Sequence, residues 1–589
     1  MDGRIVKLRE KLSKDADSAY HYYLECVAMA DETERHIAKR KSLKAGGIHF
    51  LETKKVRPVD DDVSSSTENA ILEFFLSCMG FIVGVGSTLR FPAKVYQHGG
   101  GVFFIPYLVC LSTLGLPMVF MHLAIGQYSG LSASGAFWKM MPLASGIGWA
   151  LVLLAVPVSI SYNIIVAWAT YYMWFSFRGF LPAPEGSNGT SLPWESCQAE
   201  WVQHHHCCDL KDLDCLKKNY SLTAPEAYFH YEVLGRSVVN DFTLGPVQPH
   251  LFVALAFAWI FVFFGVFKGI GSIGWTAAIT ATVPYLMLIL LLVRGLMLPG
   301  AQQGLHFLFH PNFDKLWSLQ MWKSAAEQVF YELGIDAGPL ISMASFSRYR
   351  NNIYRDAVLL VVIDALTSVL CGMVIFSFIG FLAVNSGQQI TDVLKHDPWY
   401  LAFTVYPGVT SFMYIGPLWA VLFFAMLVLS ALDAEFAWLE MIASAVTYQL
   451  GSKDKRVENR ILSLLCVFGF ICGIPFCCKG GIYIFHAIES LNANWNSFSL
   501  ALLMITLFCY VYGADNFLAD VGDMLRVPPK PKRISEWSYY RRFRYFFGPT
   551  GSYVKWCWCL CCPAILGVSS CVDHTAIAAT VQLIASNRR

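Results

Sequence analysis

The sequence predicts an all-helical protein that crosses a membrane many times. Of its 589 residues, 55% are hydrophobic and 15% are charged, and a soluble protein of this length could not bury so much apolar surface. The apolar residues gather in runs of roughly 20, the length of helix that crosses a bilayer. Two of these runs are interrupted by glycines in corresponding positions of two halves of the chain, which is typical of secondary transporters.

Eleven of the apolar runs are long enough to cross a bilayer. Glycine, proline and polar interruptions are tolerated within them where neighbouring helices or a cavity satisfy the freed backbone groups. The predicted helices are 71–95, 102–126, 147–177, 249–267, 272–298, 322–346, 356–384, 412–448, 460–478, 482–513 and 553–572.

These helices divide the chain into four parts. A polar cytoplasmic segment, 1–68, precedes the transporter core, 69–526; a basic cytoplasmic loop, 527–552, then leads to the eleventh helix and a short tail, 553–589. The segment 1–68 shows no signal peptide. Its charges predict a solvated, flexible segment that is free to bind a cytoplasmic partner. The apolar run in the tail is too short to form a twelfth helix.

The loops predict the orientation in the membrane. Lysine and arginine gather after the sixth, eighth and tenth helices, so these loops are expected inside together with the amino terminus. The long loop 179–247 is then outside, and it carries two glycosylation sequons, at Asn188 and Asn219. We therefore expect a multi-pass glycoprotein of the plasma membrane. Its net charge of +2 gives no reason to expect a nucleic-acid partner.

The same outer loop contains four cysteines in an oxidising compartment. Their spacing favours a disulfide from Cys197 to either Cys207 or Cys208. The alternative is a metal site that combines these cysteines with the histidine run 204–206.

The two interrupted helices contain the most informative residues. The first break is Gly80-Phe-Ile-Val-Gly-Val-Gly86, and the second is Glu332-Leu-Gly-Ile-Asp336-Ala-Gly338. The second break places two carboxylates where hydrocarbon would otherwise surround the helix. Ionisable side chains inside membrane spans usually face a ligand, an ion or a water-filled cavity.

Read in order, the motifs from about residue 70 to 526 resemble the neurotransmitter:sodium symporter family. The resemblance implies two inverted five-helix repeats, with helices 1 and 6 broken around a central site for a small amino acid or amine. Half-helix ends and freed carbonyls at such breaks can bind ions. The motifs are Arg90-Phe-Pro, Gly99-Gly-Gly-Val-Phe-Phe-Ile-Pro-Tyr107, Gly115-Leu-Pro, Gly126-Gln-Tyr, Tyr162-Asn, Ala167-Trp, Leu192-Pro-Trp, Leu291-Leu-Val-Arg294-Gly, Leu298-Pro-Gly, Gln328-Val-Phe, Leu432-Asp, Leu439-Glu and Gly480-Gly-Ile-Tyr.

The resemblance assigns the substrate-binding residues. Gly84 stands where amino-acid carriers keep glycine, leaving room for the carboxylate of the substrate. Tyr162 matches a tyrosine whose hydroxyl contacts the substrate, and Tyr331 matches the aromatic lid. Trp438 matches a pocket position, where its bulk favours a small substrate. For Tyr162 and Trp438, ordinary core packing is the alternative.

The resemblance also assigns a gate and one sodium site. Arg90 and Glu489 match the outer gate pair, whose opposite charges attract each other when the gate closes. The second sodium site would use the oxygen atoms that hard cations prefer. Its ligands would be the backbone carbonyls of Gly80, Val83 and Ser430 and the carboxylate of Asp433. Ala434 replaces a hydroxyl residue there, which removes one ligand.

The first sodium site and the neighbouring chloride site depart from the family pattern. The first sodium site keeps the carbonyl of Ile82, but Ser87, Glu332 and Asp364 stand where the family has an asparagine, a hydroxyl residue and another asparagine. The chloride site shares the two acidic positions and keeps only Tyr107, Gln328 and Ser368. Because fixed carboxylates would repel chloride and supply negative charge themselves, we do not expect chloride dependence.

Four interpretations of these acids stay open. Glu332 and Asp364 could bind sodium directly, or share a proton because neighbouring carboxylates cannot both ionise easily. Together with Asp336 they could hold a cationic group of the substrate. Alternatively, they serve only to accept hydrogen bonds from the freed amides of the broken helix.

The sequence thus predicts a sodium-coupled secondary transporter that works by alternating access, and no hydrolytic or redox constellation suggests an enzyme. The rival hypothesis is a transporter-like receptor or scaffold that binds a ligand without efficient transport. The altered ion sites favour this hypothesis. So does the inner gate, where the family has a charged pair and this chain has Ser65 and Tyr448. Labelled amino acid uptake separates the two hypotheses.

Overall fold

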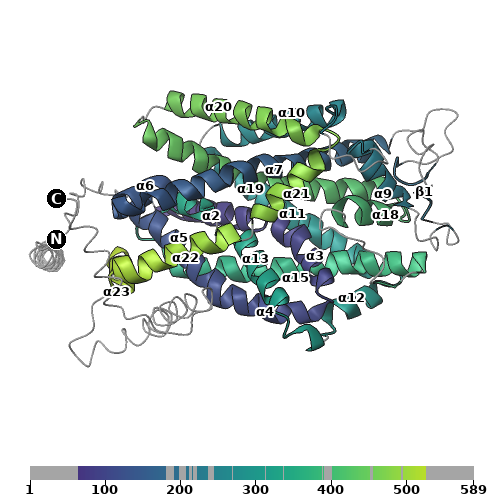
Figure 1. Cartoon of the computed structure of the whole chain (residues 1–589), viewed down its shortest axis with the longest axis horizontal. Coiled ribbons are helices and arrows are strands. Elements are labelled where there is room, and N and C mark those ends of the chain that lie inside the picture. The colour runs from purple at the N-terminus through teal and green to yellow at the C-terminus, as the bar shows by residue number, and fades with distance from the viewer. Residues whose placement is uncertain are drawn as a thin grey trace, which may run out of the picture. The chain divides into compact units, whose positions relative to one another are not determined.

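The computed structural model describes 64–180, 192–197, 207–210, 215, 222–236, 244–267, 270–311, 313–335, 337–387, 389–390, 401–451, 455–492 and 495–525. These residues are almost entirely helical (Figure 1), which confirms the predicted all-helical membrane fold. Nine helical stretches within them are long and apolar enough to cross a bilayer. They are Glu73–Gln97, Gly101–Ser129, Ser145–Arg178, Pro249–Val266, Ile279–Leu296, Ile353–Ser386, Gly416–Gln449, Arg456–Cys477 and Asn496–Gly513.

Two predicted helices are not among these nine stretches. The sixth consists of two shorter helices, α13 (Leu319–Leu333) and α14 (Pro339–Ala344), because it breaks in its middle. The eleventh, 553–572, lies outside the described residues, as do both sequons. The predicted orientation and domain limits stay expectations.

Three long helices form the frame of the site. They are α7 (Ser145–Arg178), α15 (Ile353–Ser386) and α19 (Gly416–Gln449). The helices α7 and α19 pack against each other along much of their lengths (Figure 1). Their sequences are apolar on nearly every side, which is typical of helices that contact protein on one side and lipid on another.

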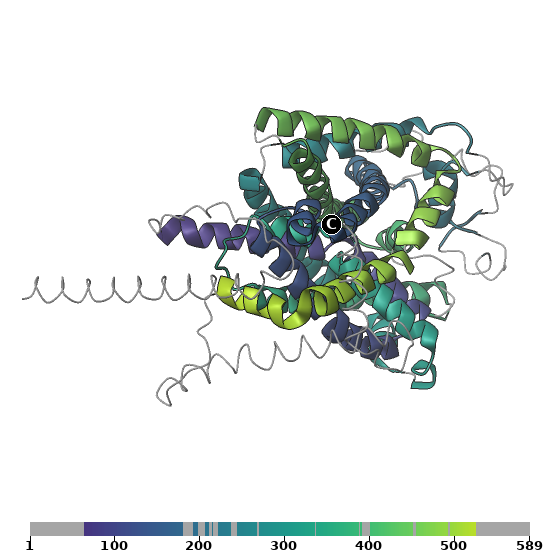
Figure 2. The same ribbon diagram turned by 60° about the vertical axis from the view of Figure 1, so that its left-hand side comes forward.

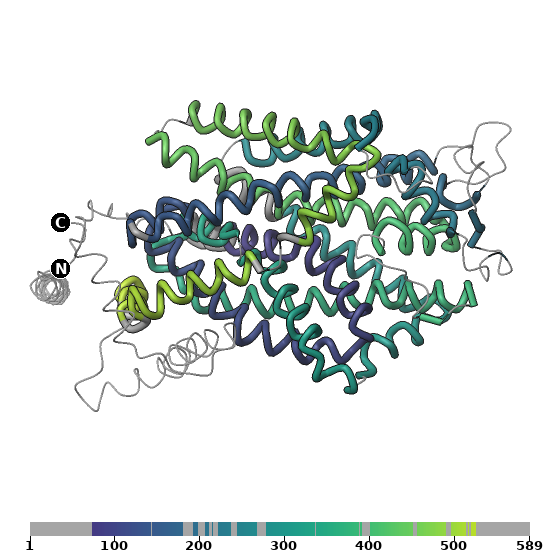
Figure 3. The backbone as a smooth tube through the Cα atoms, viewed as in Figure 1, coloured from purple at the N-terminus to yellow at the C-terminus, as the bar shows by residue number. Residues whose placement is uncertain are grey.

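The first broken helix runs through the interior of the bundle (Figure 3). It begins as α2 (Ser64–Ile82), loses its helical pattern at 83–84, and continues through a π-helical turn, Gly86–Arg90, into α3 (Phe91–Gln97). The proline at position 92 lies in the first turn of α3.

The second broken helix is interrupted by two left-handed glycines. Helix α13 (Leu319–Leu333) ends at Gly334, with φ of 57°, and α14 (Pro339–Ala344) begins after Gly338, with φ of 71°. Glycine adopts this conformation without the steric cost that a Cβ atom would bring. The break is therefore encoded locally by the sequence.

The remaining helices complete the bundle. Helices α10 and α20 pack together at its edge (Figures 1 and 2). The bounds are α4 (Phe104–Cys110), α5 (Leu116–Ser129), α6 (Ala133–Met140), α9 (Ala224–Ala227), α10 (Pro249–Val266), α11 (Ile270–Leu296), α12 (Ala301–Phe309), α18 (Tyr406–Thr410), α20 (Lys455–Gly473), α21 (Gly481–Asn492), α22 (Trp495–Thr506) and α23 (Ala514–Met524).

The loop 179–247 contains a small disulfide-bonded unit. Strands β1 (Cys207–Cys208) and β2 (Leu222–Thr223) pair in parallel. A disulfide joins Cys197 to Cys207, which confirms the predicted pairing and selects one of its two alternatives. A second disulfide joins Cys208 to Cys215, which the sequence did not predict. Because these cysteines pair with each other, the metal-site alternative is not supported.

Candidate functional site

A small cavity lies where the two helix breaks meet the helices α7 and α19. Of the six residues predicted to bind substrate, five line this cavity, and the sixth, Asp336, lies outside the described residues. The volume of the cavity is about 20 Å³, enough for about one water molecule. An amino acid can therefore enter only if the cavity widens. The lining residues are Phe81, Ile82, Gly84, Gly86, Val158, Tyr162, Tyr331, Glu332, Ala434 and Trp438.

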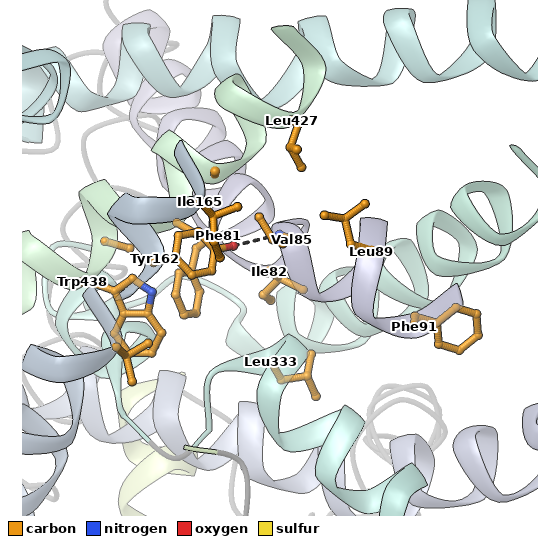
Figure 4. Close-up of a cluster of buried hydrophobic side chains, with 14 of the residues drawn as sticks. Phe81, Ile82, Val85, Leu89, Phe91, Tyr162, Ile165, Leu333, Leu427 and Trp438 are labelled. Atoms are coloured by element: carbon orange, nitrogen blue, oxygen red, sulfur yellow. Dashed lines mark hydrogen bonds between the residues drawn. The ribbon is translucent and has the colours of Figure 1, made fainter. Parts of the chain in front are cut away.

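Tyr162 holds the first helix break in place. The backbone N–H of Val85 donates a hydrogen bond of 2.8 Å to the Tyr162 hydroxyl (Figure 4). A Cβ atom added to Gly84 would lie 2.7 Å from the same hydroxyl. The site thus needs glycine at position 84 because the tyrosine hydroxyl occupies the space of a side chain. As the hydroxyl accepts from Val85, its own proton is available to a ligand.

Trp438 and Phe81 form the apolar part of the wall. Their ring centroids are 5.4 Å apart, in an edge-to-face arrangement with an angle of 76° between the ring planes (Figure 4). Gly334, in the second break, packs against Phe81 so closely that a Cβ atom would lie 2.4 Å from the ring. The two breaks and α19 therefore enclose the cavity together.

Three side chains donate hydrogen bonds to the carboxylate of Glu332. The hydroxyl of Tyr107 donates over 2.7 Å, the amide of Gln328 over 2.8 Å and the hydroxyl of Ser368 over 3.2 Å. The Gln328 amide also donates to the carbonyl of Gly86, over 3.1 Å, which connects this cluster to the first break. Glu332 is 3% exposed. The three predicted chloride-site residues thus surround a carboxylate instead.

Asp364 lies at the predicted first sodium site. The hydroxyl of Ser87 donates to one oxygen of the Asp364 carboxylate over 2.9 Å, and it lies 3.4 Å from the carbonyl oxygen of Ile82. The other carboxylate oxygen, Oδ2, is buried and has no hydrogen-bond partner. The structure therefore brings together an ionisable oxygen, a hydroxyl and a carbonyl, the ligand types that suit a hard cation.

Asp433 marks the predicted second sodium site. Its carboxylate packs directly on Gly80, where a Cβ atom would lie 2.0 Å from Oδ2. The hydroxyl of Thr280 donates to Oδ1 over 2.5 Å, while Oδ2 has no hydrogen-bond partner. The other two predicted ligands, Val83 and Ser430, are buried on the same two helical segments, at the first break and on α19. The donor set fits a sodium ion.

The outer gate pair is not joined in this conformation. The guanidinium of Arg90 lies over the ring of Tyr331, with Cζ 4.0 Å from the centroid. Glu489 lies beside His486, with 3.8 Å between Oε2 and Nδ1. Among the described residues, no ion pair connects Arg90 to Glu489. The gate stays a prediction, and the cation–π contact adds a link between Arg90 and the aromatic lid.

Two polar contacts near the site were missed in the sequence. One is Thr280, the hydroxyl partner of Asp433 on α11. The other is Glu435 on α19, which is fully buried and accepts a hydrogen bond of 2.5 Å from the hydroxyl of Ser159 on α7. An acid in the middle of a long apolar helix was the available signal for Glu435. The sequence alone does not show which distant hydroxyl pairs with each of these acids.

Known proteins resemble this chain over most of its length. A family model for the sodium:neurotransmitter symporter family matches residues 66–578. Sodium-dependent transporter snf-12 of Caenorhabditis elegans is 54% identical, in an alignment that covers 96% of this chain and 60% of the relative. This chain thus spans about three fifths of the length of the nematode relative.

Mammalian relatives agree with this match. Sodium- and chloride-dependent GABA transporter 2 of Mus musculus is 34% identical, covering 83% of this chain and 81% of the relative. The human protein of the same name is 32% identical, covering 87% and 82%. These relatives are transporters and not enzymes. The broken helices, the cavity between them and these matches lead to one conclusion: the chain belongs to the sodium:neurotransmitter symporter family.

Proposed function

We propose that this protein is a sodium-coupled carrier of a small amino acid or related amine across the plasma membrane, and that it needs no chloride. The family supports sodium coupling. One observation carries the proposal on chloride: three hydrogen-bond donors converge on the carboxylate of Glu332. This carboxylate is bound as a free anion would be, by donors alone.

The carboxylate takes over the electrostatic role of the chloride. A sodium ion bound near Asp364 gains a fixed negative charge from Glu332, so no second anion is needed to balance it. A chloride ion about 4 Å from this carboxylate would be repelled by about 4 kcal/mol at an effective dielectric constant of about 20. Chloride would therefore compete for this position with the Glu332 carboxylate, which is part of the protein and cannot dissociate.

The oxygen atoms without hydrogen-bond partners support two sodium positions. Asp364 and Asp433 each have one such buried oxygen, and each lies beside backbone of the first broken helix. Sodium would supply the free energy for uphill transport as it moves down its gradient. Asp364 and Asp433 hold the first helix break in a conformation in which its backbone oxygens can complete the two sodium sites.

The substrate site is built for a small molecule. Trp438 and Phe81 fill one side of the cavity, and the Tyr162 hydroxyl offers a proton to a substrate carboxylate. Gly84 leaves no side chain between this hydroxyl and the backbone. Because Glu332 also lines the cavity, its carboxylate can attract an ammonium group of the substrate. GABA, glycine and alanine are the first candidates, GABA because it appears in the names of two relatives.

Closure above the substrate would use Arg90, Tyr331 and Glu489. The cation–π contact holds the guanidinium over the lid, and movement of α21 toward α3 would bring Glu489 to it. Gate closure then excludes water from the cavity. Opening on the inner side completes alternating access.

Uptake of labelled candidates into cells that express the chain tests the proposal, with sodium, chloride and pH varied separately. We expect uptake that needs sodium and continues when gluconate replaces chloride. The variant Glu332→Ser should need chloride, because the donors then lack an anion. A chloride requirement in the wild type would refute the fixed-anion role. Saturable binding without uptake of any candidate would favour the receptor hypothesis.

A further inference from the structure

One arrangement of side chains occurs three times around the two helix breaks. In each case a buried carboxylate accepts a hydrogen bond from a hydroxyl on one oxygen, and its other oxygen has no partner. The pairs are Ser87 with Asp364 at 2.9 Å, Thr280 with Asp433 at 2.5 Å, and Ser159 with Glu435 at 2.5 Å. The first two pairs coincide with the expected sodium sites. The third pair has no assigned role.

We propose that Glu435, Ser159 and Asn163 form a third binding site for a monovalent cation, with sodium as the expected ion. This inference rests on the proposed sodium coupling and extends it. The Glu435 side chain has no exposed surface, and its Oε2 atom has no hydrogen-bond partner. A buried carboxylate in this state lacks a compensating charge, which is costly in a low-dielectric interior.

Asn163 provides the independent evidence for a ligand. It is fully buried, and neither its Oδ1 nor its Nδ2 atom has a hydrogen-bond partner. Buried amide groups normally have polar partners, so the Oδ1 atom of Asn163 is available as a neutral ligand for a cation. Asn163 lies four residues after Ser159 on α7, and helical side chains lean toward the preceding turn. Asn163 therefore lies on the same face of α7 as Ser159, one helical turn further along.

The chemistry of this cluster suits sodium. Glu435 supplies a carboxylate oxygen, and Ser159 and Asn163 supply neutral oxygens, all hard ligands. No basic side chain of the described residues pairs with Glu435. Glu435 acts electrostatically on two titratable groups, the hydroxyl of Tyr162 on α7 and the thiol of Cys466 on α20. Neither group supplies a positive charge.

The position of the cluster connects it to transport. Ser159 follows Val158, and Glu435 follows Ala434, and both of these neighbours line the substrate cavity. The cluster therefore lies directly behind the cavity wall, where α7 packs on α19. A cation there would stabilise the α7–α19 contact and, through Tyr162, the first helix break. A third coupled ion would also steepen the sodium dependence of substrate accumulation.

Binding of radioactive sodium to the purified full-length chain tests the proposal without a known substrate. The wild type should bind about three ions per chain, and Glu435→Gln about two, because the amide keeps the shape but removes the charge. Glu440→Gln is the matched control, since Glu440 is a buried acid five residues along the same helix, with its own partner, Ser444. This control should bind about three. Parallel binding of rubidium tests whether the site prefers potassium-like ions.

Each outcome has one interpretation. If the wild type and Glu435→Gln bind the same number of sodium and rubidium ions, the third site is wrong. A change only in the pH dependence of sodium binding also overturns it, because Glu435 then binds a proton. If Ser159→Ala and Asn163→Leu each bind one sodium ion fewer than the wild type, with unchanged gel-filtration profiles, the third site is supported. A wild type that binds no sodium would instead refute the proposed sodium coupling.

Discussion

The contact between Gly84 and Tyr162 leads to a quantitative prediction. A Cβ atom at position 84 would lie 2.7 Å from the tyrosine hydroxyl, whereas ordinary contact begins near 3.4 Å. In Gly84→Ala the hydroxyl must therefore move by about 0.7 Å. Such a shift weakens or breaks its 2.8 Å hydrogen bond with the N–H of Val85. Leaving that buried N–H without a partner costs about 1–3 kcal/mol.

A double-mutant cycle isolates this contact. Tyr162→Phe removes the hydroxyl, so it should also cost about 1–3 kcal/mol by leaving the Val85 N–H unsatisfied. In that background the alanine at position 84 meets no hydroxyl. Gly84→Ala should then add little further cost, and the coupling free energy should be about 1–3 kcal/mol.

The measurement is the free energy of unfolding in mixed micelles for the wild type, both single variants and the double variant. Gly146→Ala on α7 is the matched control, because a Cβ atom there meets nothing within 4 Å; it should not destabilise the protein. Additive effects, within about 0.5 kcal/mol, would refute the reasoning. They would mean that the alanine methyl is accommodated without displacing the hydroxyl.

Two further predictions concern the cavity and the disulfide-bonded loop. Trp438→Leu removes the ring that packs edge-to-face on Phe81, so longer amino acids should compete for uptake; an unchanged competition profile would place Trp438 outside the specificity determinants. Cys208→Ser, which breaks the second disulfide, should destabilise the loop by about 2–5 kcal/mol and lower surface delivery in a biotinylation assay. The free cysteine Cys472 provides the control Cys472→Ser, and equal delivery of both variants would contradict this prediction.

Much of the site was predictable because the breaks are local. Glycines at 334 and 338 adopt left-handed conformations that few other residues tolerate, so the sequence alone indicated where the sixth helix stops. The family motifs then assigned Tyr162, Tyr331 and Trp438 to the substrate site, and all three line the cavity between the breaks. Which of two cysteines pairs with Cys197 was not decided by spacing.

The amino-acid sequence by itself determined the helices, their breaks and the family, since apolar run length and glycine placement act over neighbouring residues. Only the tertiary structure decided what the acids contact. Glu332 receives donors from three helices, one of them 225 residues away, and Glu435 meets a serine 276 residues away. Such partners depend on how distant helices pack, because a buried polar atom is satisfied by whatever the fold places beside it. That packing surrounds the Glu332 carboxylate with three hydrogen-bond donors.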